Sequence, residues 1–306
     1  MMLNNDKMIM IEQFSGVLKN GNRNILIIGA GASNDVANLP LGKELAQKLI
    51  ESLGFSSGSK SKLFNKHLYH LEKTFGFAQD DFKTILFALN KMDNESLLDK
   101  FLESLVVSSI HSNTYSIIAD LLEKGVLHTI INFNFDEILD QEISKIYDRG
   151  NLNKIVCDKD VSYESFQKVT GFRYYIKPHG TIGFPDTLRF RRSDYYRIEK
   201  KVAELIHKIF SDTDVNIIVV GFRLKFYEFS SLINSSISNN SRILIIDKTD
   251  DILDPNLDRF YANDYLKIDE KLSLSYCFES IRKSMISVEL THSIEEPSYE
   301  VMDERR

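Results

Sequence analysis

Short apolar runs alternate with stretches of helical periodicity along most of this chain. Runs that are rich in β-branched and aromatic residues and end at a glycine or a polar residue predict buried strands. They cover Asn24–Ile28, Val126–Phe133, Phe172–Ile176, Val215–Val220 and Arg242–Ile246. Between them, apolar residues recur three and four positions apart, which is the spacing of a helix. Because strands that alternate with helices form such sheets, we predict an α/β fold with a Rossmann-like doubly wound parallel sheet.

Helical periodicity also fills a long stretch between the first two predicted strands. We therefore predict a helical insertion at about 55–122, from Phe55 to Leu122. His67 and His70 lie in it one turn apart, but no nearby cysteine or pair of acids completes a metal site, so a solvated helix face is expected. On this basis residues 1–270 form one domain that contains the insertion, and residues 271–306 form a C-terminal helix and a polar tail.

The length and composition are those of an ordinary soluble globular protein. The 306 residues are 43% hydrophobic and 27% charged with a formal net charge of -6, so general affinity for nucleic acid is not expected. No apolar run approaches the ~20 residues that span a bilayer, and the N-terminus lacks the apolar core of a secretion signal. With only Cys157 and Cys277, a disulfide framework is not expected, and a four-cysteine zinc site within this sequence is impossible. We therefore expect a cytoplasmic protein that does not engage membranes.

The first predicted strand runs into a glycine turn, Gly29-Ala30-Gly31-Ala32-Ser33, and then into a helix. Glycine has no Cβ, so such a turn lets the backbone approach an anion closely, and the N–H groups at the helix start face the negative charge. This arrangement is typical of a nucleotide phosphate site. The dinucleotide fingerprint of dehydrogenases is incomplete, since Asn34 stands where its third glycine would be. A plain tight turn without a ligand is the alternative.

Two polar motifs follow later strands. Asn134 and Asp136 lie in Asn132-Phe133-Asn134-Phe135-Asp136, at the predicted carboxyl end of a strand, which is where open α/β sheets bind ligands. Capping of the next helix by either residue is the alternative explanation. His179 lies in Lys177-Pro178-His179-Gly180, in a loop after a strand and not on an apolar helix face. We expect Asn134 and His179 to lie in a solvent-filled cleft.

Five short motifs between Ile25 and Asp247 occur in the order in which they occur in the Sir2 (sirtuin) superfamily, and the chain resembles the bacterial Sir2-like branch of that superfamily. The motifs are the glycine turn with Leu39-Pro40, Asn134-Phe135-Asp136, Lys177-Pro178-His179-Gly180, Arg192-Ser193-Asp194-Tyr195 and Val219-Val220-Gly221-Phe222-Arg223-Leu224. The chain departs from the family pattern at four places: Asn38 stands for a glycine, Leu41-Gly42 for the Phe-Arg pair of sirtuins, Asn132-Phe133 for a threonine pair and Arg223 for a serine. Asparagine tolerates the left-handed conformation that a glycine would adopt at position 38.

The resemblance implies a Sir2-like NAD-binding domain whose substrate is NAD and which cleaves the nicotinamide–ribose bond. It implies that Asn134, Asp136 and His179 are catalytic. The residues implied to hold NAD are Gly29, Ala30, Gly31, Ser33, Gly221 and Asp247. Deacetylating sirtuins carry a zinc ribbon with two cysteine pairs, which this sequence cannot build, so neither zinc nor another metal is expected. The resemblance therefore favours an NAD glycohydrolase.

The same resemblance implies a biological setting. Many bacterial Sir2-like NAD hydrolases are toxic effectors of anti-phage defence by abortive infection, and a partner or a signal activates them. We therefore expect a homo-oligomer, or a heterocomplex with a co-encoded sensor protein. The candidate contact surfaces are the insertion and the aromatic and basic run from Arg189 to Lys201.

Three alternatives stay open from the sequence. The chain could be a regulatory subunit that binds NAD or ADP-ribose without turnover, or an ADP-ribosyltransferase with an acceptor groove. It could also be a nucleic-acid-binding regulator that uses the run from Arg189 to Lys201, although the acidic net charge favours a solvated face or a protein contact there. A turnover assay separates the first alternative from a hydrolase.

Overall fold

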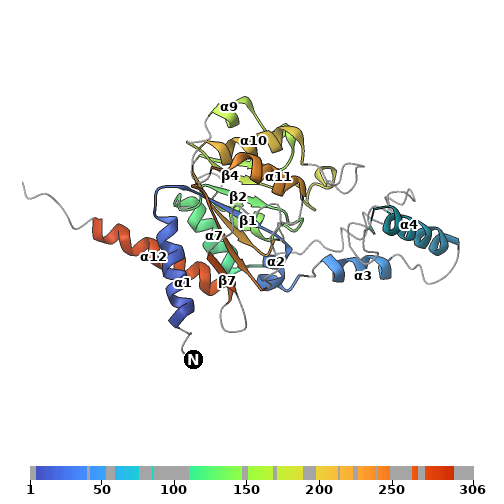
Figure 1. The fold of residues 1–306 in the computed structure, drawn as a ribbon, viewed down its shortest axis with the longest axis horizontal. Helices are drawn as coiled ribbons and strands as arrows, with labels where there is room; N and C mark the ends of the chain where they lie inside the picture. The colour runs from blue at the N-terminus through green and yellow to red at the C-terminus, as the bar shows by residue number, and fades with distance from the viewer. Residues whose placement is uncertain are drawn as a thin grey trace, which may run out of the picture.

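In the described residues of this computed structural model, seven strands form a parallel sheet, and helices cover both of its faces (Figure 1). The structure describes residues 5–39, 42–52, 59–75, 85, 88, 110–146, 151–167, 171–188, 198–212, 214–222, 227–238, 240–248, 264–267 and 273–292. The strands are β1 (Arg23–Ile28), β2 (Thr129–Asn132), β3 (Leu152–Ile155), β4 (Arg173–Ile176), β5 (Val215–Val220), β6 (Arg242–Asp247) and β7 (Asp264–Lys267). Every pair of neighbouring strands is parallel.

The order of the strands places β1 where the direction of winding reverses. The order is β3-β4-β2-β1-β5-β6-β7, so the chain leaves β1 toward β2 and later crosses back to β5 on the other side. β1 and β5 are aligned from Arg23 opposite Val215 to Ile28 opposite Val220. The predicted doubly wound parallel sheet is therefore confirmed. Its switch point, where such sheets bind ligands, lies between the carboxyl ends of β1 and β5.

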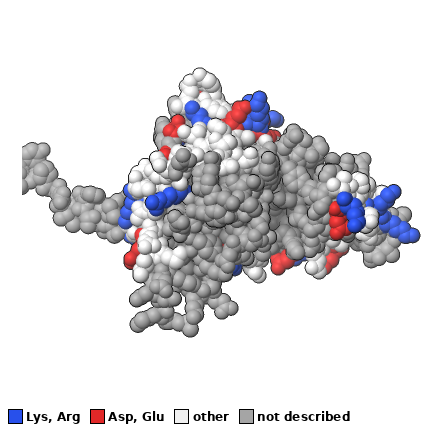
Figure 2. Space-filling view, in the orientation of Figure 1, with Lys and Arg blue, Asp and Glu red and all other residues white. Residues whose placement is uncertain are grey.

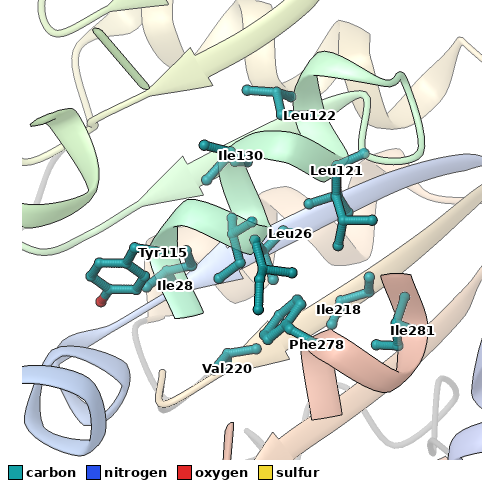
Figure 3. Packing of buried hydrophobic residues seen from close by; sticks show 14 of the residues in the cluster. Leu26, Ile28, Tyr115, Leu121, Leu122, Ile130, Ile218, Val220, Phe278 and Ile281 are labelled. Carbon is teal, nitrogen blue, oxygen red and sulfur yellow. The ribbon is translucent and has the colours of Figure 1, made fainter. Parts of the chain in front are cut away.

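The side chains of β1 enter two apolar cores because both faces of this strand are covered. Leu26 and Ile28 belong to the first core, with α1, α7, α8 and α12 (Figure 3). Ile25 and Ile27 belong to the second core, with α10 and α11. The helices are α1 (Asn5–Leu18), α2 (Ala30–Ala37), α3 (Gly42–Ser52), α4 (Ser59–Phe75), α7 (Asn113–Glu123), α8 (Ile138–Ser144), α9 (Tyr163–Gln167), α10 (Lys200–Ser211), α11 (Tyr227–Ser236) and α12 (Leu274–His292), with short 3-10 helices at Asp158–Asp160 and Pro185–Thr187.

The predicted insertion at 55–122 includes α4 and most of α7, and much of the remainder lies outside the described residues. Figure 1 shows α3 and α4 to one side of the sheet. In contrast, α7 buries Tyr115, Ile118 and Leu122 in the first core, so this helix belongs to the layer that covers the sheet. The residues from Arg189 to Arg197 also lie outside the described part of the chain.

Charges of both signs are mixed on the face of the molecule that Figure 2 shows. Lys and Arg adjoin Asp and Glu at the top and at the right of this view. An extended nucleic-acid site usually presents a basic patch or stripe, and the described residues form none on this face. Among the described helices, none combines the length and the apolar character that a membrane span requires.

Buried asparagines join α1 to the amino-terminal ends of β1 and β5. The Nδ2 of Asn216 donates to the carbonyl of Val17 at 3.1 Å and to Asn24 Oδ1 at 2.8 Å. The Nδ2 of Asn24 donates to the carbonyl of Leu18 at 2.9 Å and to that of Val126 at 2.8 Å. The last carbonyl groups of α1, which have no partner within the helix, are thus bonded to the sheet. This cluster lies at the edge of the sheet opposite to the one where ligands bind.

The pH dependence of folding should include a contribution from His128 at the start of β2. Its Nδ1 accepts a hydrogen bond from the N–H of Asn24 at 3.1 Å. Burial, together with the nearby Arg23 and Arg173, lowers the pKa of His128 from 6.5 to about 4. Because the unfolded chain binds the proton more tightly, this histidine favours the folded state above about pH 6.5, and the contribution is lost as the pH falls from about 6.5 toward 4.

The substitution His128→Asn tests this dependence because asparagine keeps an acceptor near Nδ1 and does not titrate. We expect the free energy of unfolding in urea to fall less between pH 7.5 and pH 5 in the variant than in the wild type. Carboxylates titrate alike in both proteins and cancel in the difference. Parallel pH profiles of the two proteins would contradict the assignment.

Candidate functional site

The residues singled out in the sequence gather at the carboxyl edge of the sheet. Gly29 follows β1, residues 133–136 follow β2, residues 177–180 follow β4 and Gly221 follows β5. In the sheet order, β4, β2, β1 and β5 are consecutive neighbours. Parallel pairing therefore brings these four loops to one edge, at the switch point of the fold.

The glycine turn packs directly against the end of β5. The N–H of Gly29 donates to the carbonyl of Val220 at 3.0 Å, and the N–H of Gly31 donates to the carbonyl of Gly221 at 2.9 Å. A Cβ on Gly31 would lie 2.8 Å from the Cα of Gly221, and Gly221 itself has a φ of +57°. The glycines are therefore required by the contact between two backbones. This corrects one expectation: the N–H of Gly31 is engaged within the protein and does not face a phosphate, while Ala30 begins α2 with its side chain exposed.

The end of α2 follows the expectation for the loop after the glycine turn. Asn38 has a φ of 53° and a ψ of 33°, so it adopts the left-handed conformation predicted for the residue that replaces a glycine. Asn34, which stands where a third glycine would be, donates from Nδ2 to the carbonyl of Leu39 at 2.8 Å. These two asparagines fix the direction in which the chain leaves the helix.

Ser33 on α2 is the centre of a buried cluster of hydrogen bonds. Its hydroxyl accepts a hydrogen bond from Asn134 Nδ2 at 2.8 Å and donates to Asp136 Oδ2 at 2.8 Å. The hydroxyl of Tyr115, on α7, lies 2.8 Å from Ser33 Oγ. The structure therefore brings Ser33 together with Asn134, Asp136 and Tyr115.

Asn134 donates hydrogen bonds to acceptors from three segments. Its Nδ2 also donates to the carbonyl of Gly29 at 3.1 Å, and its backbone N–H donates to Asn132 Oδ1 at 3.0 Å. Both N–H groups of the amide are thus used inside the protein, which leaves Oδ1 as its means of contact with a ligand. Only 5% of Asn134 and 7% of His179 are exposed, so the expected solvent-filled cleft is wrong for both residues. The reason is that their loops pack against α2 and against each other.

Asp136 combines two roles. Its Oδ1 accepts the N–H of Ile138 at 3.2 Å, so the capping explanation applies to this residue. The side chain of Asn134 does not cap α8, because it bonds Gly29 and Ser33 instead. Burial raises the pKa of Asp136, and Lys177 and the hydrogen bond from Ser33 offset part of that increase. A buried carboxylate of this kind is stabilised further when positive charge comes near.

Lys177 joins the loop after β2 to the loop after β4. The side chain is completely buried, and its Nζ donates to the carbonyl of Asp136 at 2.7 Å, to Asp140 Oδ2 at 2.8 Å and to Thr181 Oγ1 at 3.0 Å. Its three protons are therefore all bonded. Burial alone would raise the pKa of Asp140, but Lys177 and Lys154 outweigh it and hold the pKa below its usual value.

A second path of hydrogen bonds leads from this ion pair back to Asn134. Tyr175 donates to Asp140 Oδ2 at 2.9 Å and accepts from Asn132 Nδ2 at 2.9 Å. Asn132 in turn accepts the N–H of Asn134 through Oδ1. Asn132 thus orients the backbone of the motif that follows it.

His179 lies in a tight turn that glycine makes possible. The N–H of Gly180 donates to the carbonyl of Lys177 at 3.1 Å, and Gly180 has a φ of +81°. The ring of His179 meets Phe133 edge-on with 5.0 Å between the ring centroids, and lies 6.1 Å from Phe135. The imidazole is therefore held between the two aromatic residues of the Asn-Phe-Asp motif.

An aromatic cluster closes the site on the side of β5. Phe133 stacks on Phe222 with 4.3 Å between the centroids, and Phe229 on α11 meets both rings edge-on at 4.8 and 5.9 Å. Asp247 lies further from the switch point, half-buried at the end of β6, and the hydrogen bonds of the Ser33 cluster described above do not include it. Arg223, Leu224 and residues 192–195 lie outside the described part.

Several residues of the site could not be predicted from the sequence. Tyr115, Asn132, Asp140 and Tyr175 were given no role there, and Lys177 was noted only as part of a motif. Asp140 follows Asp136 by four residues, a spacing that places both on one side of a helix start and could have pointed to it. Tyr115 gives no such signal, because it reads as one more apolar position of a helix. In the described part of the chain, no three His, Cys, Asp or Glu side chains are grouped as a metal site.

Part of the chain is similar to a known protein family. Residues 128–268, from the start of β2 to the end of β7, match the family model of the SIR2-like domain. The match covers less than half of the chain, so residues 128–268 are similar to a SIR2-like domain, within a chain whose fold is Rossmann-like α/β. No curated protein matches the sequence.

Three of the solved structures that align with this chain are described as Sir2 proteins. One, described as "Structural Basis for the Mechanism and Regulation of Sir2 Enzymes", is 12% identical with a TM-score of 0.49, over 92% of this chain and 99% of that chain. A second, a mutant of a Sir2 homologue in complex with ADP-ribose, is 13% identical with a TM-score of 0.48, over 91% and 98%. A third, "The structure of Sir2Af2 bound to a myristoylated histone peptide", is 11% identical with a TM-score of 0.45, over 93% and 99%.

Proposed function

We propose that this protein is an NAD glycohydrolase that cleaves NAD to nicotinamide and ADP-ribose. The observation that carries the proposal is the meeting of Ser33, Asn134 and Asp136 at the switch point of the sheet, with His179 in the adjoining loop. Open α/β sheets bind nucleotides at this position. The similarity of residues 128–268 to a SIR2-like domain supports the same substrate.

The reaction needs little acid catalysis but a site that tolerates positive charge. The bond between the ribose C1′ and the nicotinamide nitrogen breaks, and its electron pair neutralises the ring nitrogen, so the leaving group needs no proton. Positive charge develops on the ribose, as in glycoside hydrolysis. The oxygen of a water molecule bonds to C1′, and that water gives up one proton.

Asp136 is suited to stabilise the developing charge. Its carboxylate is buried, and burial raises its pKa, which means that the anion is poorly solvated when no ligand is bound. A cationic nicotinamide ring or ribose nearby would compensate that charge, and the interaction is strong where water is excluded. The hydrogen bonds from Ser33 and from the N–H of Ile138 keep the carboxylate in place.

Asn134 and His179 are the groups proposed to act on the water molecule. With both N–H groups of Asn134 bonded to Gly29 and Ser33, its Oδ1 can orient water by accepting a hydrogen bond. His179 is proposed to take the proton of that water or of a ribose hydroxyl. Zinc-dependent deacylation is not proposed, since two cysteines cannot form the ribbon of two pairs.

The residues proposed to hold NAD act by shape as well as by bonding. Gly29, Gly31 and Gly221 let the ends of β1 and β5 come together beside the start of α2, where Ala30 is exposed. An anion there would face the start of a helix. Asp247 is proposed to accept from the adenosine ribose, as acids at later strand ends do in dinucleotide sites.

A binding subunit without turnover is the second candidate. The burial of Asn134 and His179, and the bonds that Ser33 already makes, favour it, because a ligand must displace or extend a closed network.

We further propose that the hydrolase is cytoplasmic and acts in anti-phage defence as an oligomer or with a co-encoded sensor protein. An enzyme that is silent until it is activated needs a ligand or a partner protein that binds its active state and its inactive state with different affinity.

Chromatography of NAD and its products, with and without candidate activators, tests the proposal. The activators are a co-expressed neighbouring protein and phage challenge of producing cells. Release of nicotinamide in equal amount to ADP-ribose is expected in the activated state. Tight NAD binding without release under every condition would instead establish the binding subunit.

A further inference from the structure

The hydroxyl of Tyr115 reaches the candidate site from a helix that the sequence assigned to the insertion. Tyr115 is 1% exposed, and its N–H donates to Ser112 Oγ at the start of α7. Figure 3 shows its ring beside Ile28 at the edge of the first core, with the hydroxyl pointing away from the apolar side chains. That hydroxyl lies 2.8 Å from Ser33 Oγ.

The number of protons on Ser33 decides the direction of this hydrogen bond. A serine hydroxyl has one proton and two lone pairs. The O–H of Ser33 donates a hydrogen bond to Asp136 Oδ2, with 2.8 Å between the two oxygens. Asn134 Nδ2 donates to one lone pair of Ser33 Oγ at 2.8 Å. Tyr115 must therefore donate to the second lone pair. Burial raises the pKa of Tyr115, so the phenol keeps the proton that it donates.

We propose that Tyr115 is a positioning residue of the NAD site. Its hydroxyl keeps the O–H of Ser33 directed at Asp136 and holds Ser33 against Asn134. This role rests on the proposed NAD hydrolysis. With both lone pairs occupied, the Ser33 hydroxyl has one direction left for its proton. Without the Tyr115 hydroxyl, Ser33 regains a free lone pair and can turn toward water or a ligand. Asp136 and Asn134 then lose a fixed partner, and small displacements of reacting groups cost much in rate.

The substitution Tyr115→Phe removes the hydroxyl and keeps the ring that fills the core. Tyr174→Phe is a matched control, since Tyr174 is also a fully buried tyrosine and its hydroxyl donates to the carbonyl of Ser165 at 2.7 Å, on the opposite face of the sheet. Both variants are made in the full chain and assayed under the conditions in which the wild type cleaves NAD. Thermal unfolding of the two should change by similar small amounts.

We expect Tyr115→Phe to lower kcat about tenfold with KM changed by less than about twofold, and Tyr174→Phe to leave both within about twofold. Because Tyr115 acts through Ser33, the double variant Tyr115→Phe/Ser33→Ala should be no slower than Ser33→Ala alone. This lack of additivity is the readout that a general loss of packing would not give.

Three outcomes would overturn the inference. A wild-type kcat for Tyr115→Phe would show that the hydroxyl does not matter. Losses that multiply in the double variant would show that Tyr115 acts independently of Ser33. A wild-type chain that neither binds nor cleaves NAD would overturn the proposed function and, with it, the positioning role of Tyr115, and this result differs from the first two because the wild type itself fails.

Discussion

Replacing either Asn134 or His179 by alanine will lower the turnover of NAD by about 100-fold or more. Asn134 offers a single oriented acceptor, because its two N–H groups are bonded to Gly29 and Ser33. His179 offers an imidazole held by Phe133 and Phe135. Each group is placed by contacts from other loops, and water cannot supply the same orientation. Turnover is measured as nicotinamide released per active chain at saturating NAD.

The same variants will also lose stability, which requires controls of equal burial. Asn134→Ala removes one of two donors from the buried Ser33 hydroxyl and one from the carbonyl of Gly29, and this costs about 1–3 kcal/mol. Asn216→Ala is the matched control, since this buried asparagine bonds Val17 and Asn24 at the opposite edge of the sheet. For His179, the variant His179→Phe fills the space between the aromatic rings without a titrating group. Loss of turnover in Asn216→Ala as large as in Asn134→Ala would assign the effect to folding, and wild-type turnover in His179→Phe would remove His179 from the mechanism.

The substitution Lys177→Met will lower the free energy of unfolding by about 3–5 kcal/mol. Lys177 is completely buried, and its removal leaves Asp140 with half of its positive surroundings and two oxygen acceptors without a donor. The main cost is that the buried carboxylate of Asp140 loses one of its two cationic partners and keeps only Lys154. Lys145→Met is the control, because Lys145 forms an ion pair of 2.7 Å with Glu142 but is 57% exposed. That change should cost less than about 1 kcal/mol.

A double variant separates the charge of Lys177 from its positioning role. In Lys177→Met/Asp140→Asn no unpaired charge remains buried, so urea unfolding should show part of the stability restored. Turnover should stay low, because the carbonyl of Asp136 and the hydroxyl of Thr181 still lack the donor that joins their loops. A cost for Lys177→Met as small as for Lys145→Met, or full turnover in the double variant, would contradict this account.

The strands that could be predicted are those buried on both faces. β1, β5 and β6 are continuous apolar runs because helices cover both sides of them. β3 and β7 were missed because they lie at the two edges of the sheet, where segments such as Leu152–Ile155 and Asp264–Lys267 carry polar residues. Edge strands are only half covered, so their sequences resemble loops.

Which loops meet at the site could be predicted, but not how their side chains bond. Parallel strands end at one edge, so the positions of Asn134, Asp136 and His179 follow from the strand pattern. Their burial and the engagement of the Gly31 N–H depend on how the β1 and β5 ends pack, which sequence spacing does not record. Tyr115 was missed for the same reason: its hydroxyl becomes a site group only because α7 packs on β1.

The most direct test of the central claim is hydrolysis of NAD by the activated chain in water labelled with oxygen-18. We predict that mass spectrometry will find equal amounts of nicotinamide and ADP-ribose, that the ADP-ribose will carry one labelled oxygen from the attack of water at C1′, and that His179→Ala will form neither product above background. NAD that stays intact with every activator tested, or ADP-ribose that is transferred to another molecule without the label, would contradict the assignment as an NAD glycohydrolase.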